Sequence, residues 1–250
     1  AVIQHDLSSD SNVYASLSEG FKAGGYATYE CTEPYDPEEV TSLEFGFKGS
    51  LSENTSLNAS LFRYDYTDFQ VLQVVGIQTV TRNAGDATVD GLEIEALSNV
   101  NDSLGINYGL TLLDATYGEF LNTNGIQPQL GEQQLDGNYL TNAPKVSINL
   151  GLNYTSPMAS GASLTYRANA SYKSRIYFSE FNEYSQDAYT IVDLNLIWES
   201  ADETMRSRFF IKNATDEEYI SGYLSSATGG GRFGQWGYPR TAGIEIQRNF

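Results

Sequence analysis

The stretch KVSINLGLNY, Lys145–Tyr154, alternates apolar and polar residues without a break. Successive side chains of a β-strand point to opposite sides, so this alternation predicts a strand with two different faces. One face carries the apolar residues Val146, Ile148, Leu150, Leu152 and Tyr154. The other face carries Ser147, Asn149, Gly151 and Asn153, which are all small or polar.

The same period of two recurs along nearly the whole chain and predicts about ten strands. Several exceed the ~5–6 residues of an ordinary strand and fit the ~9–11 residues that a tilted membrane-spanning strand needs. Strand length therefore favours a bilayer. The predicted strands are 13–21, 42–51, 55–70, 87–98, 104–117, 145–156, 162–178, 189–199, 205–213 and 241–250.

The connections between these strands alternate in length. Short polar turns at 52–54, 99–103, 156–161 and 200–204 follow every second strand. The other connections are long, at 22–41, 71–86, 118–144, 179–188 and 214–240. Short turns at one end and long loops at the other are typical of an antiparallel up-and-down transmembrane β-barrel. No apolar window is long enough for a transmembrane helix.

Charged residues mostly share the polar face of the predicted strands, as a lipid-facing surface requires. Asp114 and Arg248 are exceptions, and both lie near strand ends, where the cost of a charge is small. The alternation also shifts around Phe62. A β-bulge there would place Phe62, Tyr64 and Tyr66 on the lipid side, in place of Arg63.

Composition argues against several classes of function. A net charge of -18 makes nucleic acid an unlikely partner. The single cysteine, Cys31, and single histidine, His5, exclude a zinc site built from these residue types and an intrachain disulfide. His5 lies far from every long loop, so we expect no catalytic residue and no enzyme. We likewise expect no metal site and no cofactor. The segment GGGRFGQWG, 229–237, lacks the ending of a phosphate loop and is interpreted as an external loop.

Several segments, in this order and spacing, resemble the C-terminal barrel of TonB-dependent outer-membrane receptors. They are VYASLSEGFKAGGY (13–26), YDPEEVTSLEFGFKG (35–49), LFRYDYTDFQV (61–71), ATVDGLEIEA (87–96), NAPKVSINLGLNY (142–154), FIKNATDEEYISGY (210–223) and GYPRTAGIEIQRNF (237–250). The family fold is a barrel of about 22 strands with a plug domain in its lumen. The resemblance implies that residues 1–250 are the C-terminal portion of such a barrel, without the plug, its TonB box or the early strands.

The resemblance also implies a function and its partners. The expected function is TonB-dependent uptake of a scarce small-molecule ligand, most often a ferric siderophore, across the bacterial outer membrane. The expected partners are outer-membrane lipid and lipopolysaccharide, TonB through the plug, and the barrel-assembly machinery. A passive small outer-membrane channel is the alternative, and a barrel hydrolase is a weaker one because of the histidine count.

The expected ligand-binding residues lie on the lumen wall and in a loop. Arg167, Lys173 and Arg175 share the polar face of one strand, and Phe233 and Trp236 lie in the glycine-rich loop. The three cations could instead form ion pairs with carboxylates such as Asp193, or with the plug. Ligand binding and ion pairing therefore both stay open as their role. In the family the last strand ends on an aromatic that the assembly machinery recognises. Here that signal would comprise Ile244, Ile246 and Phe250.

Overall fold

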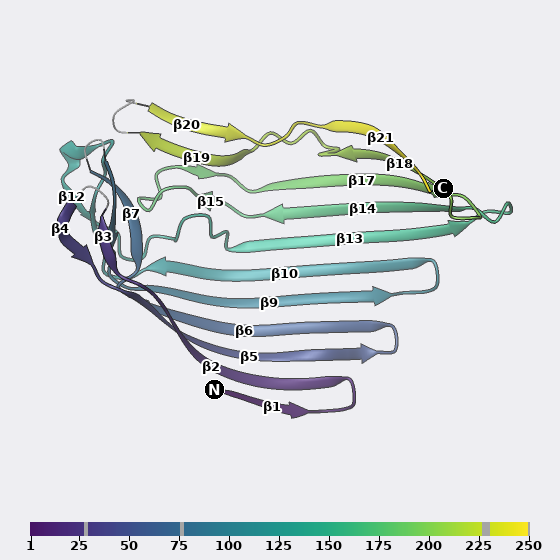
Figure 1. The fold of residues 1–250 in the computed structure, drawn as a ribbon, viewed down its shortest axis with the longest axis horizontal. Helices are drawn as coiled ribbons and strands as arrows, with labels where there is room; N and C mark the ends of the chain where they lie inside the picture. The colour runs from purple at the N-terminus through teal and green to yellow at the C-terminus, as the bar shows by residue number, and fades with distance from the viewer. Residues whose placement is uncertain (28–29, 76–77, 227–230, 250) are drawn as a thin grey trace.

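One antiparallel sheet of 11 strands dominates the computed structural model, which describes residues 1–27, 30–75, 78–226 and 231–249. Each strand of the sheet pairs with the next one along the chain (Figure 1), so the topology is up-and-down. The sheet does not close on itself, since β1 and β21 form its two edges. Its strands are β1 (Val2–Asp6), β2 (Ser11–Lys22), β5 (Glu38–Ser52), β6 (Thr55–Thr67), β9 (Ala87–Asn99), β10 (Leu104–Tyr117), β13 (Val146–Pro157), β14 (Ser163–Lys173), β17 (Tyr189–Glu199), β18 (Met205–Lys212) and β21 (Thr241–Arg248).

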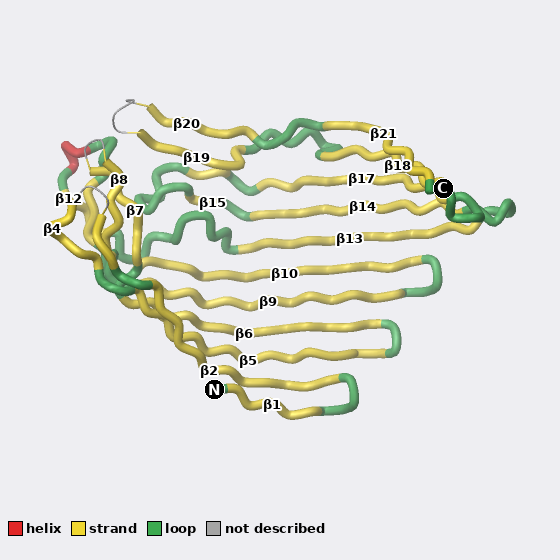
Figure 2. The backbone as a smooth tube through the Cα atoms, in the orientation of Figure 1, coloured by secondary structure: helices red, strands yellow, loops and turns green. Residues whose placement is uncertain are grey.

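The long connections all lie at one end of the sheet and the short turns at the other, as Figure 2 shows. The ten predicted strands and the sorting of loop lengths are therefore confirmed, and β1 adds an eleventh strand. The strand predicted for 162–178 is too long, because β14 ends at Lys173 and Arg175 lies beyond it. Each long connection carries a two-stranded ribbon, and one also holds the short 3₁₀ helix η1 (Pro128–Leu130). The ribbons are β3 (Gly25–Ala27) with β4 (Glu30–Tyr35), β7 (Gln70–Val75) with β8 (Gln78–Asn83), β11 (Leu121–Thr123) with β12 (Glu132–Gln134), β15 (Ile176–Tyr177) with β16 (Ser185–Gln186), and β19 (Ile220–Ser226) with β20 (Gly231–Trp236).

No helix in the described ranges is long and apolar enough to cross a membrane.

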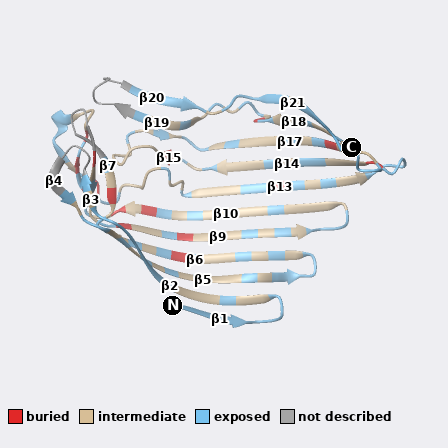
Figure 3. Cartoon of the chain, in the orientation of Figure 1, coloured by how far each residue is buried: buried red, intermediate tan, exposed pale blue. Residues whose placement is uncertain are grey.

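The pairing register puts apolar residues opposite apolar residues across the sheet. Leu110 lies opposite both Ile94 and Ile148, while Asn107 of the alternate set lies opposite Gly151. Few residues of the sheet are buried (Figure 3), and large apolar side chains such as Phe45 and Leu61 remain 52% and 59% exposed. A continuous exposed apolar face of this size needs an apolar solvent, and hydrocarbon satisfies that need.

Glycines on the polar face make room for rings from the neighbouring strand. Tyr14 lies opposite Gly46, and Phe62 lies opposite Gly91. A Cβ atom at either glycine would overlap the facing ring. Each ring therefore lies against the backbone of the next strand, which helps to fix the pairing register.

The β-bulge predicted near Phe62 is wrong. β6 pairs with β9 in one unbroken register, and the single register shift between β5 and β6 lies at Ser50/Ser52. Phe62 and Tyr64 therefore stay on the polar face, where their rings stack with centroids 4.8 Å apart. Gly91 accommodates the Phe62 ring, which removes the reason for a bulge.

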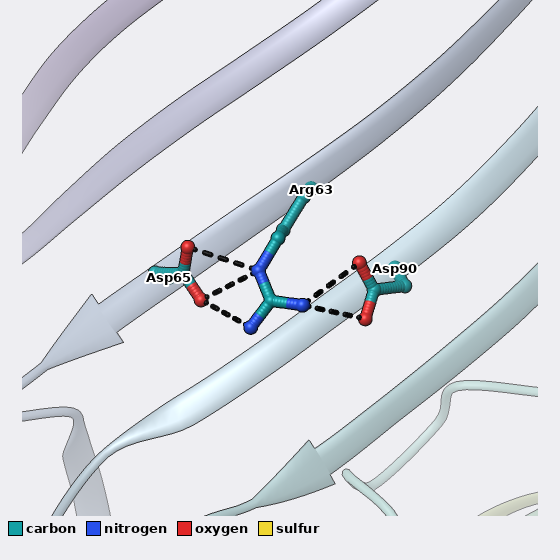
Figure 4. Close-up of polar contacts among 3 residues, drawn as sticks. All are labelled: Arg63, Asp65 and Asp90. Atoms are coloured by element: carbon teal, nitrogen blue, oxygen red, sulfur yellow. Dashed lines mark hydrogen bonds and ion pairs between the residues drawn. The ribbon is translucent and has the colours of Figure 1, made fainter.

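The same register leaves Arg63 and Asp65 on the apolar face. Arg63 lies opposite Asp90, and its guanidinium forms ion pairs with both Asp65 and Asp90 (Figure 4). The guanidinium offsets one of the two carboxylate charges, and the three residues lie in the halves of β6 and β9 that adjoin the long loops. Both circumstances lower the cost of charges on this face. Asp114 likewise lies on the apolar face, three residues before the end of β10, as expected.

Substitution of Gly91 by alanine tests the role of the ring contacts. The new methyl group would collide with Phe62, so we expect Gly91→Ala to destabilise the sheet by about 1–3 kcal/mol, as overpacking does. Gly109→Ala is the matched control, because the nearest atom to its Cβ would be 3.7 Å away. Heat-induced unfolding of the purified protein, followed by gel mobility, gives the comparison. Equal unfolding temperatures for both variants would contradict the argument, whereas Phe62→Ala should rescue Gly91→Ala.

Candidate ligand-binding site

A small apolar cluster holds several long connections together at the loop end of the sheet. Its buried members come from the end of β8, the end of β10 and the 118–144 connection, and are Ala84, Tyr117, Phe120 and Leu135. Four partly buried residues pack against them, namely Phe69, Val71, Leu140 and Phe181. The Tyr117 ring contacts Phe69 and Phe120, with centroids 6.1 and 5.3 Å apart. The long connections therefore have an apolar core of their own, unlike the sheet that carries them.

Hydrogen bonds join the 118–144 connection to the loop around 178–188. Asn122 and Asn124 are buried, and their side-chain amides donate to Glu180 and Glu183 at 3.1 and 3.0 Å. Asn182 also accepts from the backbone N–H of Tyr139 at 2.8 Å and donates to its carbonyl at 2.9 Å. These side chains satisfy one another away from solvent, so the two loops form a docked pair.

Burial, the largest influence, raises the pKa of the Glu180 carboxyl above its usual range. Repulsion from Glu183 acts in the same direction, while the hydrogen bond from Asn122 opposes it. The ionised carboxylate is therefore disfavoured in the docked loops. The free-energy cost of holding the ionised carboxylate in the docked loops is fully present above the raised pKa. This cost decreases as the pH falls through that pKa.

A column of stacked side chains ties the β19–β20 ribbon to the same region. The Tyr223 ring stacks between Phe178 and Tyr184, with centroids 6.1 and 4.9 Å away. The Arg232 guanidinium lies over Tyr184, 4.2 Å from the ring centre. Flat rings and a guanidinium stacked in this way present aromatic faces and a positive charge at the loop end. Sequence reasoning missed this column, because its members come from separate connections and no local pattern pairs them.

The three predicted cations have different surroundings. Arg167 donates to Asn153 at 2.8 Å, and Arg175 forms an ion pair with Asp187 at 2.8 Å. Lys173, the last residue of β14, is exposed, and its ammonium has no ion pair or hydrogen bond within the described ranges. Arg167 and Lys173 are six residues apart, or ~20 Å along the strand, so they do not form one cluster. Asp193, the partner considered above, instead accepts from the backbone N–H of Asn213 at 2.8 Å.

Phe233 and Trp236 are both in β20 and both project into solvent, being 57% and 67% exposed. Phe233 lies opposite Leu224, whereas Trp236 lies opposite Ile220 beyond a register irregularity. Alternation along β20 puts the two rings on opposite sides of the ribbon. A small ligand could therefore contact one of them but not both at once.

Comparison with protein families gives a match over residues 1–214 to the model described as TonB dependent receptor-like, beta-barrel. The chain belongs to the TonB-dependent receptor family. None of the curated proteins matches it.

Solved structures of the family share the fold of this chain. It resembles the ferric yersiniabactin uptake receptor FyuA from Yersinia pestis, with a TM-score of 0.83 and 21% identity, covering 100% of this chain and 36% of that one. BauA, the ferric preacinetobactin receptor from Acinetobacter baumannii, has a TM-score of 0.75 and 20% identity, covering 98% of this chain and 35% of that one. The copper transporter OprC has a TM-score of 0.71 and 15% identity, covering 100% of this chain and 38% of that one. The chain thus spans about a third of the length of these structures, and identities this low show the fold alone.

Membership of the family assigns the two faces of the receptor sheet. The polar face, with Arg167 and Lys173, corresponds to the lumen wall of such a barrel, and the apolar face to its outside. Ile244 and Ile246 of β21 lie on the apolar face opposite Phe209 and Ser207, and are 71% and 68% exposed. Phe250 lies outside the described residues, so the assembly signal stays a prediction.

Residues that could support other chemistry are few in the described part of the receptor. No group of three or more His, Cys, Asp or Glu residues there could hold a metal ion. His5 lies in β1 opposite Val13, on the apolar face and away from the loop end. The side chain of Cys31 lies outside what the structure describes.

The raised pKa of Glu180 predicts that acid strengthens loop docking. Hydrogen exchange of peptides from residues 118–144, corrected for intrinsic rates, should show more protection near pH 5 than at pH 7. Glu180→Gln keeps an acceptor for Asn122 but has no charge to desolvate, so its protection should be high at both pH values.

Glu119→Gln is the control for this experiment, since Glu119 is an exposed carboxylate of the same connection. It should behave like the unaltered receptor. An unchanged pH dependence in Glu180→Gln would show that another group is responsible.

Proposed function

We propose that this chain is the C-terminal part of the barrel of a bacterial outer-membrane receptor that imports a scarce anionic ligand, of which ferric siderophores are the first class to test. Family membership supports the general uptake role. The siderophore assignment draws on relatives described as a ferric yersiniabactin uptake receptor and a ferric preacinetobactin receptor. The copper transporter with the same fold shows that the fold alone does not define the ligand.

The observation that carries the proposal is the position of Lys173. This cation is exposed on the polar face at the loop end of β14, and no carboxylate of the described chain neutralises it. An unpaired ammonium facing a wet lumen is ready to bind an anionic group. Arg232, stacked on Tyr184, adds a second positive charge at the same end.

Uptake would then need an energy source. Under this proposal the ligand is captured at the loop end, and TonB acts through a plug domain encoded in the same receptor. The bacterial outer membrane is the proposed location, with the barrel-assembly machinery recognising the last strand. The apolar outer face and the one-sided loops support a transmembrane barrel.

The direct test is transport of iron-55 loaded onto a panel of siderophores by cells in which this receptor is the only high-affinity route. Uptake should saturate at low concentration and should stop when TonB is deleted. Uptake that persists without TonB and rises linearly with concentration would favour the passive channel instead. Loss of every response to the panel would leave the receptor fold intact but overturn the siderophore assignment.

Lys173→Gln should weaken ligand binding in the complete receptor. One charge-assisted hydrogen bond contributes about 1.5–3 kcal/mol, which corresponds to an affinity roughly 10- to 100-fold lower. Lys48→Gln is the control, because Lys48 lies on the same polar face near the short-turn end, with its ammonium 5.1 Å from the Tyr14 ring centre. Titration followed by tryptophan fluorescence measures both. Equal affinities for the two variants would exclude Lys173 from the site.

A further inference from the structure

The connection between β11 and η1 contains the single Asn-Gly pair of the sequence, Asn124–Gly125. An asparagine followed by glycine is especially prone to spontaneous deamidation. Glycine has no Cβ to hinder attack by its backbone nitrogen on the side-chain amide that precedes it. The reaction needs water and no enzyme, so its rate in a folded protein depends on how the asparagine is held.

The amide of Asn124 is held at both ends. Its Nδ2 donates to Glu183 at 3.0 Å, and its Oδ1 accepts from the backbone N–H of Ile126 at 3.0 Å. The residue is only 5% exposed. Movement of the amide out of this arrangement breaks both bonds, and burial keeps away the water that the reaction consumes. Docking of the two loops therefore restrains the reactive group.

Asn122 provides a matched comparison two residues earlier. It is also 5% exposed, and its amide donates to Glu180 at 3.1 Å. The residue that follows it is Thr123, whose β-branched side chain crowds the backbone nitrogen that would have to attack. The same two loops thus hold one asparagine that is chemically prone to deamidation and one that resists it.

We propose that Asn124–Gly125 is a site of spontaneous deamidation, that docking of the 118–144 and 178–188 loops suppresses the reaction, and that the product separates these loops. The reaction occurs from the undocked state, so its rate follows the population of that state. The inference goes beyond the proposed transport role and needs no particular transport ligand.

The reaction balances with water as the only co-reactant. The Gly125 nitrogen loses its proton and bonds to Cγ of Asn124. The Cγ–Nδ2 bond breaks, and the amide nitrogen leaves as ammonia, which takes up a proton. The resulting five-membered succinimide adds one water molecule. Opening at Cγ gives aspartate, whereas opening at the main-chain carbonyl carbon gives isoaspartate, with one more carbon in the backbone.

Either product would oppose docking. A carboxylate at position 124 accepts hydrogen bonds but cannot donate one, so the bond to Glu183 is lost and two anionic groups face each other. The new charge would also lie at a buried position without a cationic partner in the described contacts. Glu183 already repels Glu180. A third carboxylate adds to an acidic group that docking has to hold together.

The first test compares the purified protein with a synthetic peptide of residues 118–130, both kept at mildly alkaline pH and physiological temperature. Deamidation is followed by peptide mass spectrometry after pepsin digestion in acid, which avoids further reaction. Asn124 should convert in the peptide and at least about tenfold more slowly in the protein, because docking includes a hydrogen bond to a charged group. Asn122 should convert in neither. Equal rates for Asn124 in protein and peptide would overturn the proposal.

Glu183→Ala removes the acceptor of the Asn124 amide and should bring its rate in the protein towards that of the peptide. Glu183→Gln keeps an acceptor and should remain slow. Glu119→Ala is the matched control, since Glu119 is an exposed carboxylate of the same connection, and it should leave the rate unchanged. No acceleration in Glu183→Ala would contradict the role of docking. If Glu183→Ala fails to fold, the comparison of protein with peptide decides.

Asn124→Asp reproduces one product and tests its effect on the loops. Hydrogen exchange of peptides from 118–144 and 178–188 should become about tenfold faster or more, because a bond to a charged group is lost. Gly125→Ala should instead keep protection and slow deamidation, since Gly125 has no positive φ that alanine would strain. Native protection in Asn124→Asp would overturn the proposed separation of the loops.

Discussion

Hydrocarbon offers no water to satisfy backbone N–H and C=O groups, and this constraint explains most features of the sheet. Within the 11-stranded sheet, every strand between the edge strands β1 and β21 is paired on both sides, so its backbone groups have partners within the protein. Side chains must then divide by face, apolar towards lipid and polar towards the lumen. Glycines such as Gly46 and Gly91 let rings lie against the backbone, and the strands keep their register. Arg63, Asp90 and Asp114 lie opposite one another where the apolar face ends towards the long loops.

Local pattern was sufficient to predict the strands and the sorting of loops, since period two and turn residues are properties of short segments. It failed where a residue depends on a distant partner. Phe62 can stay on the polar face because of Gly91, and Arg63 can stay on the apolar face because of Asp90, 27 residues along the chain. No short-range pattern contains those pairings. The predicted bulge would have changed the faces of Phe62 and Arg63 within one strand, whereas Gly91 and Asp90 of the neighbouring strand accommodate both residues without a bulge.

The candidate site illustrates the same limit. Sequence identified Arg167, Lys173 and Arg175 as cations of one strand, but only the structure shows that Arg175 pairs with Asp187 and that Lys173 is left without a partner. The stacked column around Tyr223 joins residues from two separate connections, which alternation cannot foresee. The loop end thus combines preformed contacts, through Glu180 and the apolar cluster, with exposed groups. Structures described as siderophore receptors and as a copper transporter share this fold, so the fold alone does not define the ligand.

The central claim is that one face of each strand meets lipid and the other meets water. Single cysteines placed along Leu104–Tyr117 of β10, in a receptor lacking Cys31, can carry a spin label for relaxation by oxygen and by a water-soluble nickel complex. Labels at 106, 108, 110 and 112 should be relaxed by oxygen, and those at 105, 107, 109 and 111 by nickel, with the first series changing to nickel at 114. Equal relaxation by nickel at every position would contradict a membrane barrel and, with it, the assignment of the two faces.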